Sequence, residues 1–166
     1  YGARVEGRPM QRLLSITMAR LNGRTVIRVD AGAAWVYPRS PREVVPAGVR
    51  EIDIANRAAS QQITDPAKVA RIVRWFDALN IVQPGIGPVH CALLLASKVT
   101  FTFRSATGEM VAKAIAPSVP ASGCNPIEFT IHGRRQTPLI DSTPGGGRAF
   151  IERVQRLLGV RFAQPA

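Results

Sequence analysis

The residues that could carry covalent chemistry in this chain are two cysteines and two histidines among 166 residues. His90 and Cys91 are neighbours, and neighbouring side chains of an extended segment point to opposite sides, so they do not form a catalytic pair. Cys91 and His132 can meet in space, with Asp141 to orient the imidazole, and would then form a thiol hydrolase site. A small hydrolase using Cys91 and His132 is therefore one alternative function.

The same cysteines have three other readings. Cys91 and Cys124 can form a disulfide, remain as two buried thiols or belong to a metal site. Zinc needs about four ligands, so both histidines would have to join the two cysteines. His90 and Cys91 are adjacent in sequence, which is a poor spacing for two ligands of one metal ion. We favour the disulfide, which indicates an oxidising, exported location. It would remove about 3–4 kcal/mol of unfolded-chain entropy.

The carboxylates give no second route to catalysis. All 11 are spread along the chain, and no pair lies at helical spacing with a histidine. Asp53 and Glu128 could converge from neighbouring strands, but nothing in the pattern brings them together, as a glycosidase or a two-metal site would need. The sequence therefore predicts no catalytic, metal or cofactor-binding residue, and it favours a non-catalytic protein over an enzyme.

Two places could contact a ligand without doing chemistry. Gly146, Gly147 and Arg148 lie at the start of a predicted helix, where free amides and the helix dipole favour an anion. The segment lacks the Gly-Lys-Ser/Thr ending of a phosphate-binding loop, so a flexible connection is the favoured interpretation. Trp35 and Tyr37 share one strand face beside a proline-rich loop, and they are the aromatic residues that we consider for a ligand groove.

The formal net charge of +11 and the pI near 11.3 suggest a negatively charged partner. The densest basic positions are Arg134 and Arg135, followed by the arginines of the first predicted hairpin. The other arginines are dispersed along the chain, which is typical of a generally basic surface in a protein encoded by a GC-rich genome. A basic nucleic-acid-binding module is a second alternative function, although most aromatic residues occupy the inward phase of their elements.

The clearest predicted element is a helix from Thr64 to Asn80. Asp65 can cap its first free amides, and Pro66 suits the first helical position. Apolar residues recur at helical spacing and form one stripe, which predicts a helix packed on a sheet: Val69, Ile72, Val73, Phe76 and Leu79.

The first hairpin is predicted from residues 15–21 and 24–30, joined by Asn22-Gly23, whose residues tolerate the positive φ of a type I′ turn. Met18 then lies opposite Ile27, and Ile16 lies opposite Val29. We expect this apolar face to pack under the first helix.

Further extended segments are expected at 33–37 after a bend or bulge at Gly32, and at 50–56, 98–104, 109–116, 127–132 and 136–140. A second helix is expected at 148–158, with Gly159 as its C-terminal cap. The sum predicts an α+β fold: a curved antiparallel sheet of six to eight strands with two amphipathic helices on one face. We expect one domain over 1–166, with a poorly ordered lead-in at 1–10 and tail at 162–166. No apolar run is long enough for a transmembrane segment.

The order of these features resembles exported, often lipid-anchored domains of unknown function from high-GC Gram-positive bacteria. The matching features are the strand–Asn-Gly–strand opening, Val-Pro-Ala-Gly-Val at 45–49, Thr64-Asp65-Pro66-Ala67, Cys91 ahead of Val99-Thr100-Phe101-Thr102-Phe103-Arg104, Gly108, Cys124 and Leu157-Leu158-Gly159. The resemblance implies an exported location and a disulfide. Because the sequence begins at Tyr1 without a charged-then-apolar leader, we expect either that a signal segment has been removed or that the sequence starts inside a longer protein. The leading prediction is an exported, non-catalytic domain that binds an envelope protein or an anionic cell-envelope polymer.

Overall fold

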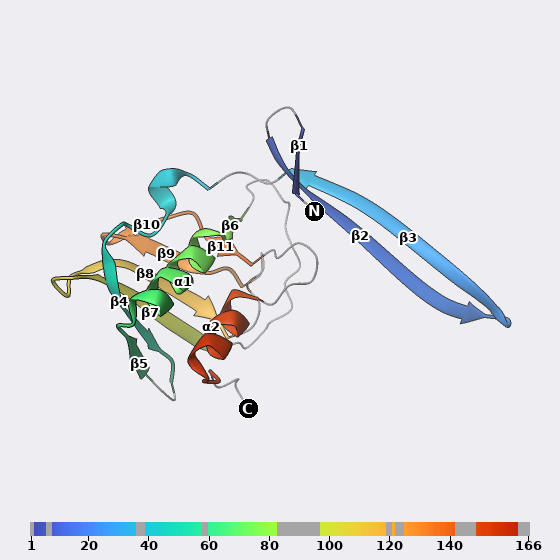
Figure 1. Ribbon diagram of the computed structural model, residues 1–166. Helices are drawn as coiled ribbons and strands as arrows, with labels where there is room; N and C mark the ends of the chain where they lie inside the picture. The colour runs from blue at the N-terminus through green and yellow to red at the C-terminus, as the bar shows by residue number, and fades with distance from the viewer. Residues whose placement is uncertain are drawn as a thin grey trace. The chain divides into compact units, whose positions relative to one another are not determined.

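The computed structural model describes residues 2–5, 8–35, 39–57, 60–82, 97–118, 121, 125–141 and 149–162, and only the backbone of 2–5, 8–13 and 32–35. These residues belong to two compact units. The described residues up to 35 form the first, which we call the ribbon unit. Those from 39 onward form the second, the sheet unit. Each unit is described by itself (Figure 1).

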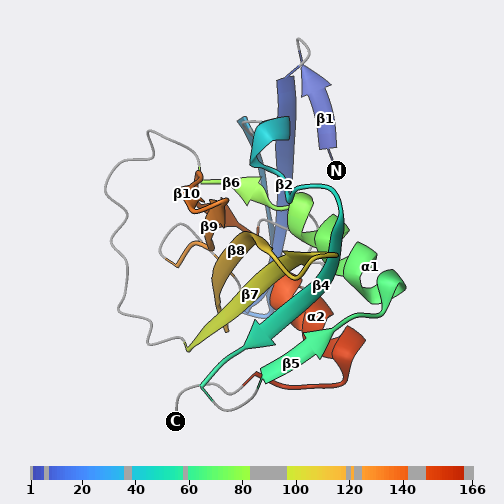
Figure 2. The ribbon, with the colours of Figure 1, turned by 90° about the vertical axis from the view of Figure 1, so that its left-hand side faces the viewer.

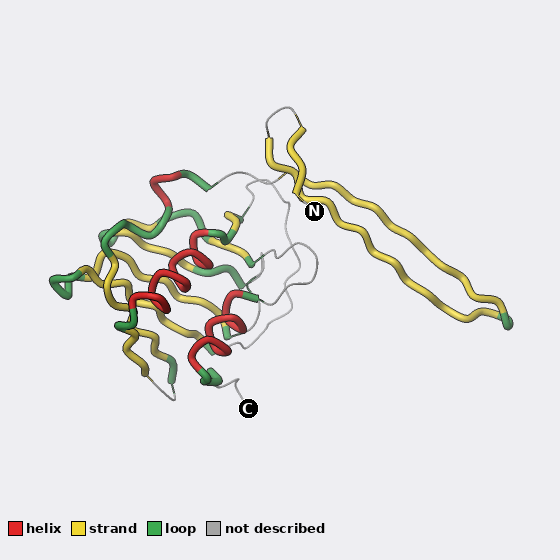
Figure 3. The backbone as a smooth tube through the Cα atoms, in the orientation of Figure 1, coloured by secondary structure: helices red, strands yellow, loops and turns green. Residues whose placement is uncertain are grey.

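The ribbon unit is a three-stranded antiparallel sheet in the order β1-β2-β3. Its strands are β1 (Gly2–Val5), β2 (Arg8–Leu21) and β3 (Arg24–Trp35). β2 and β3 run side by side to a tight turn (Figure 3). Asn22 and Gly23 at this turn have φ of 51° and 75°, as a type I′ turn requires. The predicted hairpin and its pairing of Met18 with Ile27 are confirmed.

The sheet unit contains a six-stranded antiparallel sheet in the order β10-β9-β8-β7-β4-β5. Its strands are β4 (Val49–Ala55), β5 (Ser60–Ile63), β7 (Lys98–Ser105), β8 (Met110–Pro117), β9 (Glu128–Ile131) and β10 (Arg134–Arg135). β6 (Asn80–Ile81) and β11 (Leu139–Ile140) form a separate pair. The alternation in β7 sets its faces, because Val99, Phe101 and Phe103 are fully buried while the residues between them are not.

Two helices cover one face of this sheet: α1 (Pro66–Asp77) and α2 (Phe150–Leu158) (Figure 2). The Asp65 carboxylate accepts hydrogen bonds from the amides of Ala67 (2.8 Å) and Lys68 (3.2 Å), which confirms the predicted cap. Gly159 ends α2 with φ of 68°, also as predicted. A short 3-10 helix, η1 (Pro41–Glu43), precedes β4.

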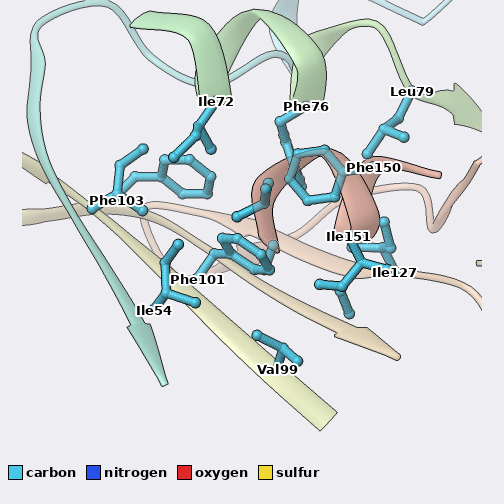
Figure 4. Close-up of a cluster of buried hydrophobic side chains, with 14 of the residues drawn as sticks. Ile54, Ile72, Phe76, Leu79, Val99, Phe101, Phe103, Ile127, Phe150 and Ile151 are labelled. Atoms are coloured by element: carbon cyan, nitrogen blue, oxygen red, sulfur yellow. The ribbon is translucent and has the colours of Figure 1, made fainter. Parts of the chain in front are cut away.

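The core lies between the sheet and the two helices. Phe76 of α1 is completely buried, with ring centroids 5.4 Å from Phe103, 4.9 Å from Phe129 and 5.7 Å from Phe150. Phe101 and Phe150 add a fourth ring pair at 5.3 Å. Figure 4 shows Phe76, Phe101, Phe103 and Phe150 between the helices and β7. The α+β class and the role of the first helix are therefore confirmed.

The expected place of the first hairpin is wrong. Its strands belong to the ribbon unit and not to the six-stranded sheet, and Ile16, Met18, Ile27 and Val29 remain 58–70% exposed where burial under α1 was expected. The physical reason is that the inner face of the six-stranded sheet is already filled by phenylalanine rings from the sheet and both helices. Alternation in a strand shows that one face is apolar, but it does not show what covers that face.

The observed strand pairing and burial also differ from the sequence predictions in smaller ways. The lead-in contains β1 and the start of β2, and Gly32 pairs with Leu13 in an unbroken register, without the expected bulge. The passage before α1 contains β5, and the predicted last strand pairs with β6. Phe162 in the expected tail is buried at 8% exposure. Within the described ranges, neither helix is long and apolar enough to cross a membrane.

Candidate functional site

The ribbon unit presents an apolar surface to solvent. Antiparallel pairing puts opposed residues on the same face, and the pairs Leu14–Ala31, Ile16–Val29 and Met18–Ile27 follow one another along one side. We call these six residues the apolar face. Its five large side chains are exposed to 58–70% of their surface. Such a cluster is unlike the scattered single apolar residues of ordinary surfaces, and it indicates a binding surface.

The opposite face of the ribbon is mixed in character. Ser15, Thr17 and Asp30 alternate with the apolar face, and Arg28 forms an exposed ion pair with Asp30 at 2.8 Å. An ion pair this exposed contributes little to stability. Leu21 and Val26 near the turn are the large apolar side chains on this side. The two faces therefore differ enough for single substitutions to address one without the other.

The chemistry of the apolar face narrows what it can bind. Residues 14–31 contain no aromatic side chain, so bases cannot stack there and no tryptophan or tyrosine can anchor it at a lipid interface. None of its six residues is charged, and the nearest charged residues on the same side of the ladder are Arg12 and Arg20, each two positions beyond one end of the face. The part of the ribbon unit that carries the apolar face has only the two strands β2 and β3, because β1 pairs with residues 8–11 of β2. An isolated pair of strands is only marginally stable, so covering the apolar face would also stabilise this part.

A buried arginine organises the loop that begins the sheet unit. Arg39 is 6% exposed, and its guanidinium carbon lies 5.2 Å and 5.1 Å from the ring centroids of Phe76 and Phe129. Its Nη1 donates to the Phe76 carbonyl and its Nε to the Glu43 carbonyl, each at 2.8 Å. The positive charge thus lies at the C-terminal end of α1, where the helix dipole favours a cation.

The charges around Arg39 are affected by burial. Burial lowers the pKa of Arg39, while the carboxylates of Asp77, at 3.8 Å, and Glu43 act in the opposite direction. Burial also raises the pKa of Asp77, against the hydrogen bond from the Val45 amide and the charge of Arg39. Arg39 Nη2 is buried and has no hydrogen-bond partner in the described part of the chain. This cluster is a structural anchor for the end of α1.

Glu43 gives a first prediction, on pH. Its carboxylate accepts hydrogen bonds from the Thr137 hydroxyl at 2.7 Å and the Ser40 amide at 3.3 Å, and the Thr137 bond is the main cause of its lowered pKa. A lowered acid pKa stabilises the fold above the ordinary value of 4.5, and this stabilisation is lost as the pH falls through the folded value. Glu43→Gln should therefore lower the unfolding free energy by about 1 kcal/mol at pH 7 and by less at pH 3.

Urea unfolding of both proteins at the two pH values measures this difference. Arg42→Gln, at an exposed position of the same turn, is the control and should show no such pH dependence. An equal deficit at pH 7 and pH 3 would contradict the role given to the Glu43 carboxylate.

The two carboxylates considered for a paired site do not meet. Asp53 lies on β4 and Glu128 on β9, and β7 and β8 separate these strands. Asp53 instead accepts a hydrogen bond from Arg104 Nε at 2.7 Å, and this bond is the main cause of the raised pKa of Arg104. Glu128 forms an ion pair with Lys98, with 3.7 Å between Glu128 Oε1 and Lys98 Nζ. Within the described ranges, His, Cys, Asp and Glu form no group of three that could hold a metal ion.

The remaining predicted residues divide into described and undescribed ones. Arg134 and Arg135 are exposed on β10, at one edge of the six-stranded sheet, beside the turn formed by His132 and Gly133. Trp35 ends β3, and its side chain lies outside the described residues. Six other predicted residues lie wholly outside the described ranges: Tyr37, Cys91, Cys124, Gly146, Gly147 and Arg148. The disulfide and the anion cradle therefore stay predictions.

Asp141 caps the second helix. Its carboxylate accepts a hydrogen bond from the Phe150 amide at the start of α2, whose N-cap residue Ala149 has no capping side chain. A depression beside it, between β8 and α2, has no room for even a water molecule. This place is a helix cap and not a binding pocket.

Sequence reasoning had the signal for the apolar face but assigned it to the core, because the alternation of Ile16 and Met18 has the same form in both cases. Arg39 was missed, since a single arginine in a proline-rich loop carries no periodic signal. Searches against family models, curated proteins and solved structures find no match to this chain.

Proposed function

We propose that this chain is an exported, non-catalytic binding domain whose apolar face docks a protein of the cell envelope. One observation carries the proposal: five large aliphatic side chains lie in adjacent cross-strand pairs and are 58–70% exposed. Exposed aliphatic surface of this extent is stabilised when another protein covers it. The exported location rests on the resemblance and on the proposed Cys91–Cys124 bridge.

A protein partner fits the apolar face better than an anionic polymer does. A polyanion binds where cations gather, and its affinity falls steeply with salt. The apolar face has no charge of its own, and Arg28 on the opposite face is already paired with Asp30. The net charge of +11 belongs to the protein as a whole, where it favours solubility and approach to acidic partners.

The test places a photoreactive residue on each face of the ribbon. Met18→p-benzoylphenylalanine reports on the apolar face, and Thr17→p-benzoylphenylalanine, one residue away on the opposite face, is its matched control. Both variants are made in the cells that produce the protein, irradiated, and separated on denaturing gels for mass spectrometry. We expect one discrete protein adduct from position 18, several-fold stronger than from position 17. Equal yields, or adducts with lipid or glycan alone, would contradict the proposal.

A further inference from the structure

We propose that the protein on the apolar face is a second copy of this chain, in a two-fold symmetric dimer with the two apolar faces packed together. This inference rests on the function proposed above and names its partner. Two-fold dimers use one self-complementary patch on both subunits. The apolar face meets that condition, because both of its strands contribute aliphatic side chains to it. The charged residues Arg28 and Asp30 belong to the opposite face, so that no charge lies within the apolar face.

Electrostatics favours this face over other surfaces for self-association. Each copy has a net charge of +11, so two copies repel each other through most pairs of surfaces. The apolar face is a place where they can meet without opposing like charges directly. A partner of different sequence needs no such uncharged surface, since acidic groups could pair with the surrounding arginines.

Arg12 and Arg20 lie beyond the two ends of the apolar face. Both belong to the same side of the ladder, two positions before Leu14 and two positions after Met18. Ribbons that run in the same direction bring each arginine toward its own counterpart, and ribbons that run in opposite directions bring Arg12 of one copy toward Arg20 of the other. In either arrangement these charges lie at the rim of the interface, with Ile16 and Met18 near its centre.

The size of the face agrees with a modest dimer affinity. Each large side chain offers about 100 Å² of apolar surface, so that one face offers about 500 Å². Two copies then bury about 1,000 Å², which is the lower limit for a specific interface. We expect a dissociation constant on the order of 10 µM. Packed sheets separated by about 10 Å leave room for one interdigitated layer of these side chains.

Sedimentation equilibrium of the full chain tests the dimer. The wild type should be dimeric at 100 µM. Ile16→Glu/Met18→Glu should weaken association by at least about 100-fold, since it buries charge at the centre of the interface. The matched control is Ser15→Glu/Thr17→Glu, which changes the net charge equally on the opposite face and should remain dimeric. A monomeric wild type at this concentration, or a dimer that survives the change at 16 and 18, would overturn the inference.

A charge-swap mixture separates a lost interface from a damaged ribbon. Ile16→Glu/Met18→Glu and Ile16→Lys/Met18→Lys should each be monomeric, while their equimolar mixture should form a heterodimer because opposite charges then meet. Failure of the mixture to associate would overturn the packing of the two apolar faces against each other. If the control variant also dissociates, irradiation of purified Met18→p-benzoylphenylalanine decides: a covalent species of twice 17.9 kDa supports the dimer, and its absence overturns it.

The same crosslink distinguishes this inference from the proposed function. An adduct in cells with a different protein, and none with a second copy, would remove the dimer and leave a protein-binding apolar face. An adduct with neither would remove both.

Discussion

Replacing Phe76 with alanine should lower the free energy of unfolding of the sheet unit by about 3–5 kcal/mol. Phe76 is completely buried, because its ring is enclosed by Phe103 and Phe129 from the sheet and Phe150 from α2. Its removal would leave a cavity at the point where the sheet and both helices meet. The rigid ring contacts around it limit how far the site can collapse.

Denaturant unfolding followed by far-ultraviolet circular dichroism measures this loss. Arg71→Ala is the control, since Arg71 is an exposed position of the same helix and its truncation should change stability by less than about 0.5 kcal/mol. A loss below about 1 kcal/mol for Phe76→Ala would show that α1 is not the helix on which the sheet packs.

Replacing Arg39 with methionine should cost about 2–4 kcal/mol, although a buried methionine is more apolar than the arginine that it replaces. The substitution leaves the carbonyl oxygens of Phe76 and Glu43 without the donors that now reach them at 2.8 Å. It also removes the positive charge 3.8 Å from Asp77. Methionine keeps contact with the two rings that the guanidinium covers, so the loss reports on polar groups more than on packing.

Arg42→Met is the matched control for this measurement, because it makes the same chemical change at an exposed position three residues away. It should be nearly neutral in the same urea titration. Equal effects at positions 39 and 42 would contradict the role of Arg39 as an anchor for the end of α1.

The Arg39 variant should also respond to acid in a defined direction. Burial raises the pKa of Asp77 above its ordinary value of 3.8, and loss of the nearby cation should raise it further. When the pKa of an acid is higher in the folded than in the unfolded protein, ionisation of that acid destabilises the fold. The destabilisation by Asp77 therefore appears as the pH rises past 3.8. The difference in stability between wild type and Arg39→Met should therefore be larger at pH 7 than at pH 3.5. Adding Asp77→Asn to both proteins should remove this dependence of the stability difference on pH.

Local features of the fold could be predicted from the sequence because each depends on neighbours along the chain. Asp65 and Pro66 begin α1, and Gly159 ends α2, through contacts within one helical turn. Asn22 and Gly23 form the hairpin turn because their backbones accept positive φ. The register of the hairpin then follows from the two-residue turn without any information from elsewhere.

The candidate site could be predicted only in part, because its residues were recognised and its surroundings were not. The pairing of Ile16 with Val29 is as expected, while the prediction that these side chains are buried is wrong. Arg39 shows the complementary failure. It acquires its role from Phe76 and Phe129, which lie 37 and 90 positions further along the sequence, and no local pattern marks such an arginine.

By itself the sequence determined where α1 begins and where α2 ends, the hairpin turn, the alternation of the strands and hence the α+β class. Tertiary structure alone decided which strands share a sheet, which apolar stripes meet in the core and which one remains exposed. The physical reason is that hydrogen-bonded caps and turns are satisfied within a few residues, whereas burial depends on the amount of apolar surface that other segments supply. In the sheet unit the phenylalanine rings of β7, β9, α1 and α2 pack against one another, whereas the large side chains of the apolar face stay 58–70% exposed.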